Sequence, residues 1–149
     1  MSDSRAVMET RDKIRRWLTD KLHGVEIDSE GNLDFRHGSA RIRVTVEDLP
    51  GDDDDTVVEV VSPVLFDVPK TPELLEWVAR SMSKYRFGTF FIVDSDDGNL
   101  NLLYRITLLG TYLDLPEFEA AYLFVAITAD ELDNELQEKF GGERFYEDD

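Results

Sequence analysis

The chain has 149 residues and a formal net charge of −17, because it contains 33 acidic residues and only 16 basic ones. Its length is that of one domain, and a hydrophobic content of 42% supports a real core, so we do not expect disorder. So acidic a chain is repelled by phosphate backbones and anionic lipid, and we expect neither nucleic acid nor a membrane as a partner. The lack of cysteine excludes disulfides, thiolate catalysis and cysteine-based zinc sites.

A first helix is predicted to begin at a cap, Ser2 or Ser4, and to run to about Leu22, with Gly24 as its stop. Apolar residues at helical spacing, Trp17 among them, form a stripe, and Arg11 projects into its middle. Residues 3–24 carry six basic and four acidic residues, unlike the acidic remainder of the chain. A solvated helix of mixed charge is the simpler interpretation. The alternative is a cationic edge that contacts an acidic partner or another subunit.

The first strand region holds a short hairpin at residues 25–35, an alternating strand at 40–47 and a β-branched strand at 56–66. Four consecutive aspartates, Asp52 to Asp55, precede the last of these strands, and their mutual repulsion predicts a solvated loop. Pro63 interrupts the same strand, and a proline there fits only a sheet edge or a bulge.

The second predicted helix begins at Thr71, which caps it, with Pro72 in its first turn. A hairpin over residues 86–94 and 100–112 follows it. The predicted buried stripe of the helix consists of Leu74, Leu75, Val78 and Met82.

The third predicted helix begins near Asp114 and ends at Gly141-Gly142. Its first half is apolar nearly all round, because Leu123, Phe124 and Ile127 lie off the main apolar stripe. Such a helix needs cover on a second side. A large exposed apolar area is unusual in a soluble monomer, and contact between two copies related by a two-fold axis is the commonest way to cover it. We therefore expect a homodimer.

These elements predict a single α+β domain with three helices and a largely antiparallel five-stranded sheet, in the order helix, three strands, helix, two strands, helix. The domain is expected over residues 1–142, followed by an acidic C-terminal tail at 143–149. Helices can cover one face of the sheet, so the other face needs a lid, a second subunit or a client. The strands are apolar on both faces: Val57 and Val61 lie beside Val58 and Val60, and Phe91 and Val93 beside Phe90 and Ile92.

No catalytic pattern stands out in the sequence. The segment from Asp94 to Gly98 resembles the start of a calcium loop, but Arg105 occupies the position of the bidentate glutamate, so we interpret it as a turn. The two histidines fit no metal-ligand pattern, the serines have no nearby base, and no glycine-rich phosphate fingerprint is present. We expect no enzyme activity, no cofactor and no metal. The alternative is a metal-dependent hydrolase that uses the acidic loops around Asp53 and Asp96.

Five short segments, taken in their order and spacing, resemble the TY-Chap family of YbjN-like proteins and type III secretion chaperones. They are Ser62-Pro63-Val64-Leu65, Thr71-Pro72-Glu73-Leu74-Leu75, Phe87-Gly88-Thr89-Phe90-Phe91, Ala129-Asp130-Glu131-Leu132-Asp133 and Phe140-Gly141-Gly142. The resemblance covers residues 14–142 and implies a compact α+β domain that binds peptides or protein segments without catalysis, often as a homodimer. One departure is the segment from Glu76 to Ser81, where relatives often have an asparagine-rich helix end.

We therefore predict a module that holds a client segment or regulates a partner, with a purely self-associating regulator as an alternative. The N-terminal sequence has no signal-peptide apolar region and no apolar run is long enough to span a bilayer, so we expect a cytoplasmic protein. The residues expected at protein-binding surfaces are Arg11, Trp17, Val58, Val60, Phe91, Val93, Leu123, Phe124 and Ile127.

Overall fold

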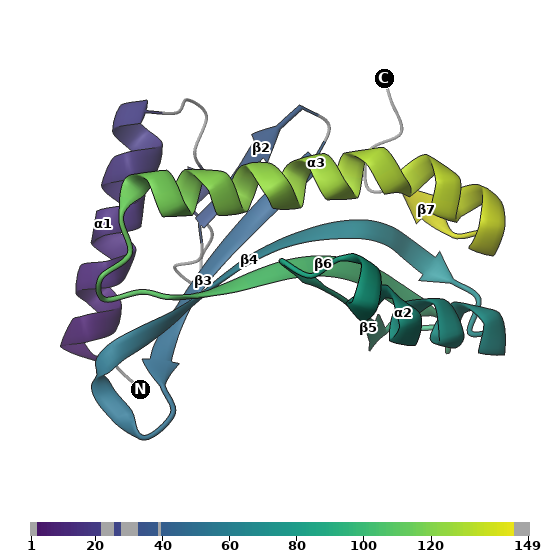
Figure 1. Cartoon of the computed structure of the whole chain (residues 1–149), viewed down its shortest axis with the longest axis horizontal. Helices are drawn as coiled ribbons and strands as arrows, with labels where there is room; N and C mark the ends of the chain where they lie inside the picture. Colours follow the sequence, from purple (N-terminus) through teal and green to yellow (C-terminus); the bar gives the residue numbers. More distant parts are fainter. Residues whose placement is uncertain (1–2, 22–25, 28–32, 39, 145–149) are drawn as a thin grey trace.

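The computed structural model describes residues 3–21, 26–27, 33–38 and 40–144 (Figure 1). Within these residues the chain forms three helices: α1 (Arg5–Lys21), α2 (Pro72–Lys84) and α3 (Leu115–Phe140). The strands are β1 (Glu26–Ile27), β2 (Leu33–His37), β3 (Ala40–Leu49), β4 (Asp52–Val68), β5 (Thr89–Asp94), β6 (Leu100–Leu109) and β7 (Glu143–Arg144). The predicted end of the first helix, the turn of the first hairpin and the last five residues of the predicted tail lie outside the described residues.

Local capping chemistry fixes where the helices begin, as the sequence predicted. The side chains of Ser4, Thr71 and Asp114 each accept a hydrogen bond from the backbone N–H three residues further along, at 3.1, 3.2 and 3.0 Å. Ser2, the alternative cap, lies outside the described residues. Gly141 ends α3 with a positive φ of 83°, a conformation that favours glycine.

The strands form one antiparallel sheet in the order β1-β2-β3-β4-β6-β5, and β7 pairs with β4. The predicted α+β class, with three helices and an antiparallel sheet, is confirmed. The predicted hairpin at residues 25–35 corresponds to β1 and β2, and the other predicted strands correspond to β3–β6. The two-residue strand β7 brings the number in the described chain to seven. Arg144 lies opposite Leu65 and Glu143 opposite Phe66, so the first two residues of the predicted tail belong to the sheet.

Strand β4 differs from the prediction at its start and agrees with it in the middle. Asp52 to Asp55 belong to β4, so the prediction of a loop there is wrong. The tight turn at Pro50-Gly51 brings Asp52 opposite Leu49, and at the end of a hairpin carboxylates can stay in water while the backbone is extended. The register against β6 shifts after Pro63, so of the two predicted alternatives, an edge or a bulge, the structure shows the bulge.

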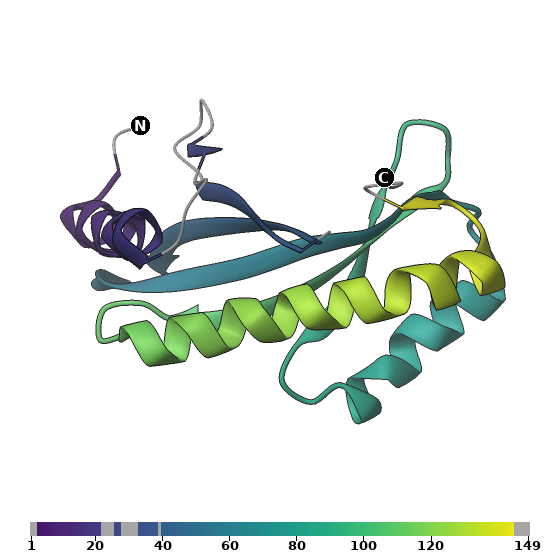
Figure 2. The same ribbon diagram turned by 90° about the horizontal axis from the view of Figure 1, so that it is seen from above.

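The helices pack on one face of the sheet. Helices α2 and α3 lie together on one side of it, and α3 runs along its length (Figure 2). Helix α1 lies across one end (Figure 1) and joins the same core, because the Trp17 ring lies 5.7 Å from that of Phe118 in α3. Beneath them Val58, Val60, Leu102 and Tyr104 are fully buried.

Helix α2 buries only part of the predicted stripe. Leu74 is fully buried and Val78 packs against the core, but Leu75 and Met82 are exposed, so the predicted burial of these two residues is wrong. The reason is the position of Trp77, whose ring packs 4.9 Å from that of Phe90 in β5 and turns the opposite side of the helix toward solvent.

The alternate strand residues point away from the helices and form what we call the helix-free face. Among the described elements no helix packs on it, and apart from Asp34 its side chains are half-buried or exposed. Its register is set by the pairs Arg43–Val61, Val61–Arg105 and Leu103–Phe91. The face consists of Asp34 of β2, Arg41, Arg43 and Thr45 of β3, Val57, Glu59, Val61 and Pro63 of β4, Phe91 and Val93 of β5, and Leu103, Arg105, Thr107 and Leu109 of β6.

Candidate functional site

A pocket of about 310 Å³ opens on the helix-free face where β2, β3, β4 and β6 meet, and we call it the sheet pocket. It exists because pairing between β3 and β4 stops at Arg43 and Val61, while β4 continues through the bulge at Pro63. Beyond Val61, no residue of β3 pairs with β4, and this side of β4 is left open beside Pro63. The pocket is lined by Asp34, Arg41, Arg43, Val61, Pro63, Phe66 and Leu103.

One wall of the sheet pocket is a fixed charge cluster. Arg43 donates two hydrogen bonds to the Asp34 carboxylate, at 2.9 Å from Nε and 3.2 Å from Nη2, and Arg41 donates a third at 3.2 Å. Burial alone would raise the pKa of Asp34, whose side chain is only 5% exposed, but the hydrogen bonds and charges of Arg43 and Arg41 outweigh it and lower the pKa below its usual value. The ionised Asp34 carboxylate is therefore held by two guanidinium groups at the wall of the pocket.

The floor of the sheet pocket is apolar and continues toward the free edge of the sheet. Leu103 lies opposite Phe91 of β5, and the Arg105 guanidinium stacks over the Phe91 ring at 4.5 Å. Val93 is exposed further along the same strand. Among the described strands β5 pairs with β6 alone, so its other edge presents unpaired main-chain groups of the kind that an extended peptide can join.

A second apolar surface lies on the helix side of the molecule, and we call it the α3 patch. Phe87 is 70% exposed, Phe124 37% and Ile127 49%. The rings of Phe87 and Phe124 lie 5.6 Å apart in an edge-to-face arrangement, so the two residues form one surface. Leu123 is partly buried beside them. No strand edge or charge cluster is part of this patch.

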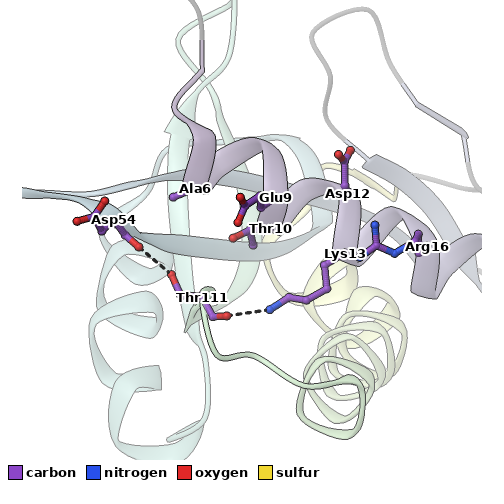
Figure 3. Close-up of a pocket in the computed structure, with 8 residues that line it drawn as sticks. All are labelled: Ala6, Glu9, Thr10, Asp12, Lys13, Arg16, Asp54 and Thr111. Atoms are coloured by element: carbon purple, nitrogen blue, oxygen red, sulfur yellow. Dashed lines mark hydrogen bonds between the residues drawn. The ribbon is translucent and has the colours of Figure 1, made fainter.

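A second hollow, of about 360 Å³, separates α1 from the turn between β6 and α3 (Figure 3). Lys13 donates hydrogen bonds to the backbone oxygens of Gly110 and Thr111, at 2.9 and 3.1 Å, and Thr111 donates to that of Asp54 at 3.4 Å. Burial lowers the pKa of Lys13 despite the opposing charge of Asp114. These polar groups bind one another, so this hollow serves to fasten α1 to the domain.

Glycine is required in that same turn. A Cβ at Gly110 would overlap the hydroxyl of Thr56. That hydroxyl is buried and shares a hydrogen bond of 2.9 Å with Thr10 of α1. Helix α1 is thus held by contacts that leave no space for a side chain at this point.

The nine residues predicted at protein-binding surfaces fall in four separate places. Arg11 binds Asp3 at 2.6 Å on α1, and Trp17 packs against α3. Phe91 and Val93 lie on the helix-free face, beside the sheet pocket and at the edge. Leu123, Phe124 and Ile127 lie on the α3 patch.

Val58 and Val60 are fully buried under the helices, so they cannot contact a client. Their neighbours Val57 and Val61 take the surface positions instead, because side chains alternate along a strand. Sequence reasoning missed Asp34, Phe66 and Leu103 as residues of the sheet pocket and Phe87 as a residue of the α3 patch. The only available signal was the outward alternation of Arg41 and Arg43 in β3.

The described residues contain no assembled metal site. Among its histidine, aspartate and glutamate residues, no group of three or more is arranged to hold a metal ion. Asp96 is exposed in the turn between β5 and β6. No described helix is both long enough and apolar enough to cross a membrane.

Comparison with known proteins identifies the family. The model of the T3SS (YopN, CesT) and YbjN peptide-binding chaperone 1 family matches residues 8–148. The chain belongs to this chaperone family. Among curated protein sequences, none matches it. The predicted resemblance to YbjN-like proteins and type III secretion chaperones is confirmed, and with it a function in binding peptides or proteins.

Two solved structures share the chaperone fold. YbjN from E. coli is 15% identical over 85% of this chain and 92% of its own, with a TM-score of 0.54. A chain of the ExsC–ExsE complex is 16% identical over 88% of this chain and 95% of its own, with a TM-score of 0.55. At such identities the likeness shows the fold alone.

Proposed function

We propose that the protein binds an extended segment of a client protein on the helix-free face, with the sheet pocket as its anchor, and that it acts by binding without catalysis. The observation that carries this proposal is an apolar hollow on a sheet face that no described helix covers, in a member of a peptide-binding chaperone family. The ExsC–ExsE complex supports it, since a protein of the same fold is found there with a protein partner.

The arrangement suits an extended peptide. An apolar client side chain would fill the hollow over Val61, Pro63 and Leu103, and the next apolar side chain would reach Phe91. Main-chain groups of the client could pair with the open edge of β5, as in strand addition. The guanidinium groups of Arg41 and Arg43 line the hollow and favour clients with a carboxylate next to the apolar residue.

We also propose a homodimer formed through the α3 patch. Exposed aromatic residues in contact, such as Phe87 and Phe124, are typical of interfaces, and Ile127 extends the surface along α3. The patch lies on the helix side and the sheet pocket on the opposite face. A dimer would therefore leave both sheet pockets open.

The proposed client site can be tested with a phage-displayed library of random peptides selected on the purified protein. Leu103→Glu places a carboxylate on the pocket floor and should weaken the selected peptides by about 30-fold, the loss typical of a central interface residue. Thr107→Glu is the matched control, because it adds the same charge to the same strand and face away from the pocket. Equal affinity of Leu103→Glu and the control, measured by fluorescence anisotropy, would contradict the proposed site.

A further inference from the structure

Arg105 of β6 lies between the sheet pocket and the free edge of the sheet. In the strand register it is opposite Val61 of β4 on one side and Thr89 of β5 on the other. Val61 lines the pocket, and Thr89 belongs to the edge strand. A client segment that runs from the pocket toward the edge therefore passes Arg105.

The guanidinium group of Arg105 is held from two directions. Its Nη1 donates a hydrogen bond of 3.3 Å to Glu59, and its central carbon lies over the Phe91 ring, 4.5 Å from the ring centre. The side chains of Arg105 and Glu59 are 37% and 34% exposed, so their ion pair adds little to stability but orients the group. One face of the planar group is thus held against Phe91, and one of its edges is directed to Glu59.

The opposite face of the guanidinium group is open to a client. Arg105 lies on the helix-free face, which no described helix covers (Figure 2). A side chain that approaches Phe91 from solvent therefore meets the guanidinium group before it meets the ring. Guanidinium is planar, delocalised and weakly hydrated, so it stacks well on an aromatic ring and gains less from an aliphatic side chain.

A carboxylate suits this position less well than a ring. Glu59 already accepts a hydrogen bond from Arg105, and its charge repels a second carboxylate at the same guanidinium group. The residues opposite Glu59 on its two sides, Thr45 and Thr107, carry no charge that would offset this repulsion. The chemistry at Arg105 therefore favours an uncharged aromatic side chain.

The spacing between the pocket and Arg105 fits an extended segment. Leu103 is on the pocket floor, and Phe91 lies opposite it on the neighbouring strand. Neighbouring strands are roughly 5 Å apart, so the hollow over Val61 and Leu103 lies roughly 5 to 10 Å from Phe91. In an extended segment, successive side chains on the same face are two positions and roughly 7 Å apart. A residue two positions from the apolar anchor would therefore lie over Arg105.

We propose that Arg105 determines the specificity of the client site by selecting an aromatic side chain two positions from the apolar anchor. The client ring would lie on the open face of the guanidinium group, which would then be enclosed between that ring and the ring of Phe91. This inference rests on the proposed function, because it names the client chemistry that the same site recognises.

Substitution of Arg105 by lysine separates stacking from charge. Lysine keeps the positive charge and can still pair with Glu59, but it has no planar group to stack. Peptides selected from the random library on the wild-type chain should carry Phe, Tyr or Trp two positions from the apolar residue that they share. They should bind Arg105→Lys about fivefold more weakly, as measured by fluorescence anisotropy.

Arg80→Lys is the matched control for this substitution. Arg80 also donates a hydrogen bond to a glutamate, Glu76, but the two residues lie on α2 and not on the helix-free face. This variant should bind the selected peptides as the wild type does.

A change in the peptide tests the same contact from the client side. Cyclohexylalanine has nearly the shape of phenylalanine but no aromatic ring. In place of the peptide's aromatic residue it should cost about fivefold in affinity on the wild-type chain and nothing further on Arg105→Lys. Such non-additivity would not arise if Arg105 only supported the fold. In isotope-enriched wild-type protein, the aromatic peptide should move the Nε–H signal of Arg105 upfield, and the cyclohexylalanine peptide should not.

Three outcomes would overturn the inference: selected peptides without an aromatic residue at that spacing, equal affinity of the wild type and Arg105→Lys, or an equal loss from cyclohexylalanine in both proteins. If one of these is found while Leu103→Glu still weakens the peptides, the proposed function stands and the assigned specificity falls. If no peptide binds, or if Leu103→Glu binds peptides as Thr107→Glu does, the proposed function falls and the assigned specificity falls with it.

Discussion

The sheet pocket and the α3 patch are both apolar surfaces, but they differ in shape and charge. The sheet pocket is a hollow whose floor is apolar and whose wall is an aspartate held by two arginines. The α3 patch is built from exposed side chains that project from the surface, with Phe87 and Phe124 in contact at its centre. A hollow with a charged wall suits one side chain of an extended peptide, whereas a projecting aromatic surface suits another folded surface.

The difference has its origin in the two faces of the sheet. Strand β4 carries valines at consecutive positions, and alternation sends Val60 under the helices and Val61 to the sheet pocket. The same residue type therefore serves the core on one face and a binding surface on the other. This contrast gives the experiment with the largest expected effect.

Val60→Asp should unfold the domain and Val61→Asp should not. Burial of an unpaired carboxylate at Val60, which is 0% exposed, should cost roughly 4 kcal/mol or more of the free energy of unfolding. At the half-exposed Val61 the carboxylate can stay hydrated, so the cost should be about 1 kcal/mol, with peptide binding lost instead. Urea denaturation followed by circular dichroism measures both. Similar losses of stability in the two variants would refute the assignment of the two faces.

The sequence predicted features that local chemistry determines. Caps at Thr71 and Asp114, the stop at Gly141 and the bulge at Pro63 each depend on a few neighbouring residues, so their signals are present in the sequence itself. The loop predicted at Asp52 to Asp55 was wrong because pairing across the hairpin turn, and not repulsion between neighbours, decides the backbone there.

The surfaces could not be predicted because they depend on register. In β4 both faces are apolar, so no local signal says whether Val58 and Val60 or their neighbours are buried. Helical periodicity in α2 allows two stripes, and only the contact between Trp77 and Phe90 selects the buried one. The cluster of Asp34 and Arg43 joins two strands through a pairing that the sequence does not specify.

Phe124→Glu should dissociate the proposed dimer and leave the sheet pocket working. A charge at the centre of the α3 patch should raise the dimer dissociation constant by about 30-fold, while library-selected peptides bind as before. Because the chain has a net charge of −17, dimerisation should also strengthen as salt screens the repulsion. Multi-angle light scattering across a salt series reports the mass.

Met82→Glu is the matched control for this dimer experiment, since Met82 is an exposed apolar residue of α2 outside the patch. It should leave the mass unchanged. A wild-type mass near 17.1 kDa at high protein concentration and moderate salt would end the dimer proposal. The α3 patch would then need another occupant.

The smallest expected effect concerns the charged wall of the sheet pocket. Because the folded-state pKa of Asp34 lies below its ordinary value, its ionised form stabilises the fold at neutral pH, and this contribution is lost as pH falls through the lowered pKa. Asp34→Asn should therefore cost about 1 kcal/mol at pH 7, a modest value because both arginines remain partly in water. The difference between the two proteins should shrink below about pH 4. Urea unfolding from pH 7 down to pH 3 measures it, and a difference that stays constant over this range would show that the arginines do not act through the charge of Asp34.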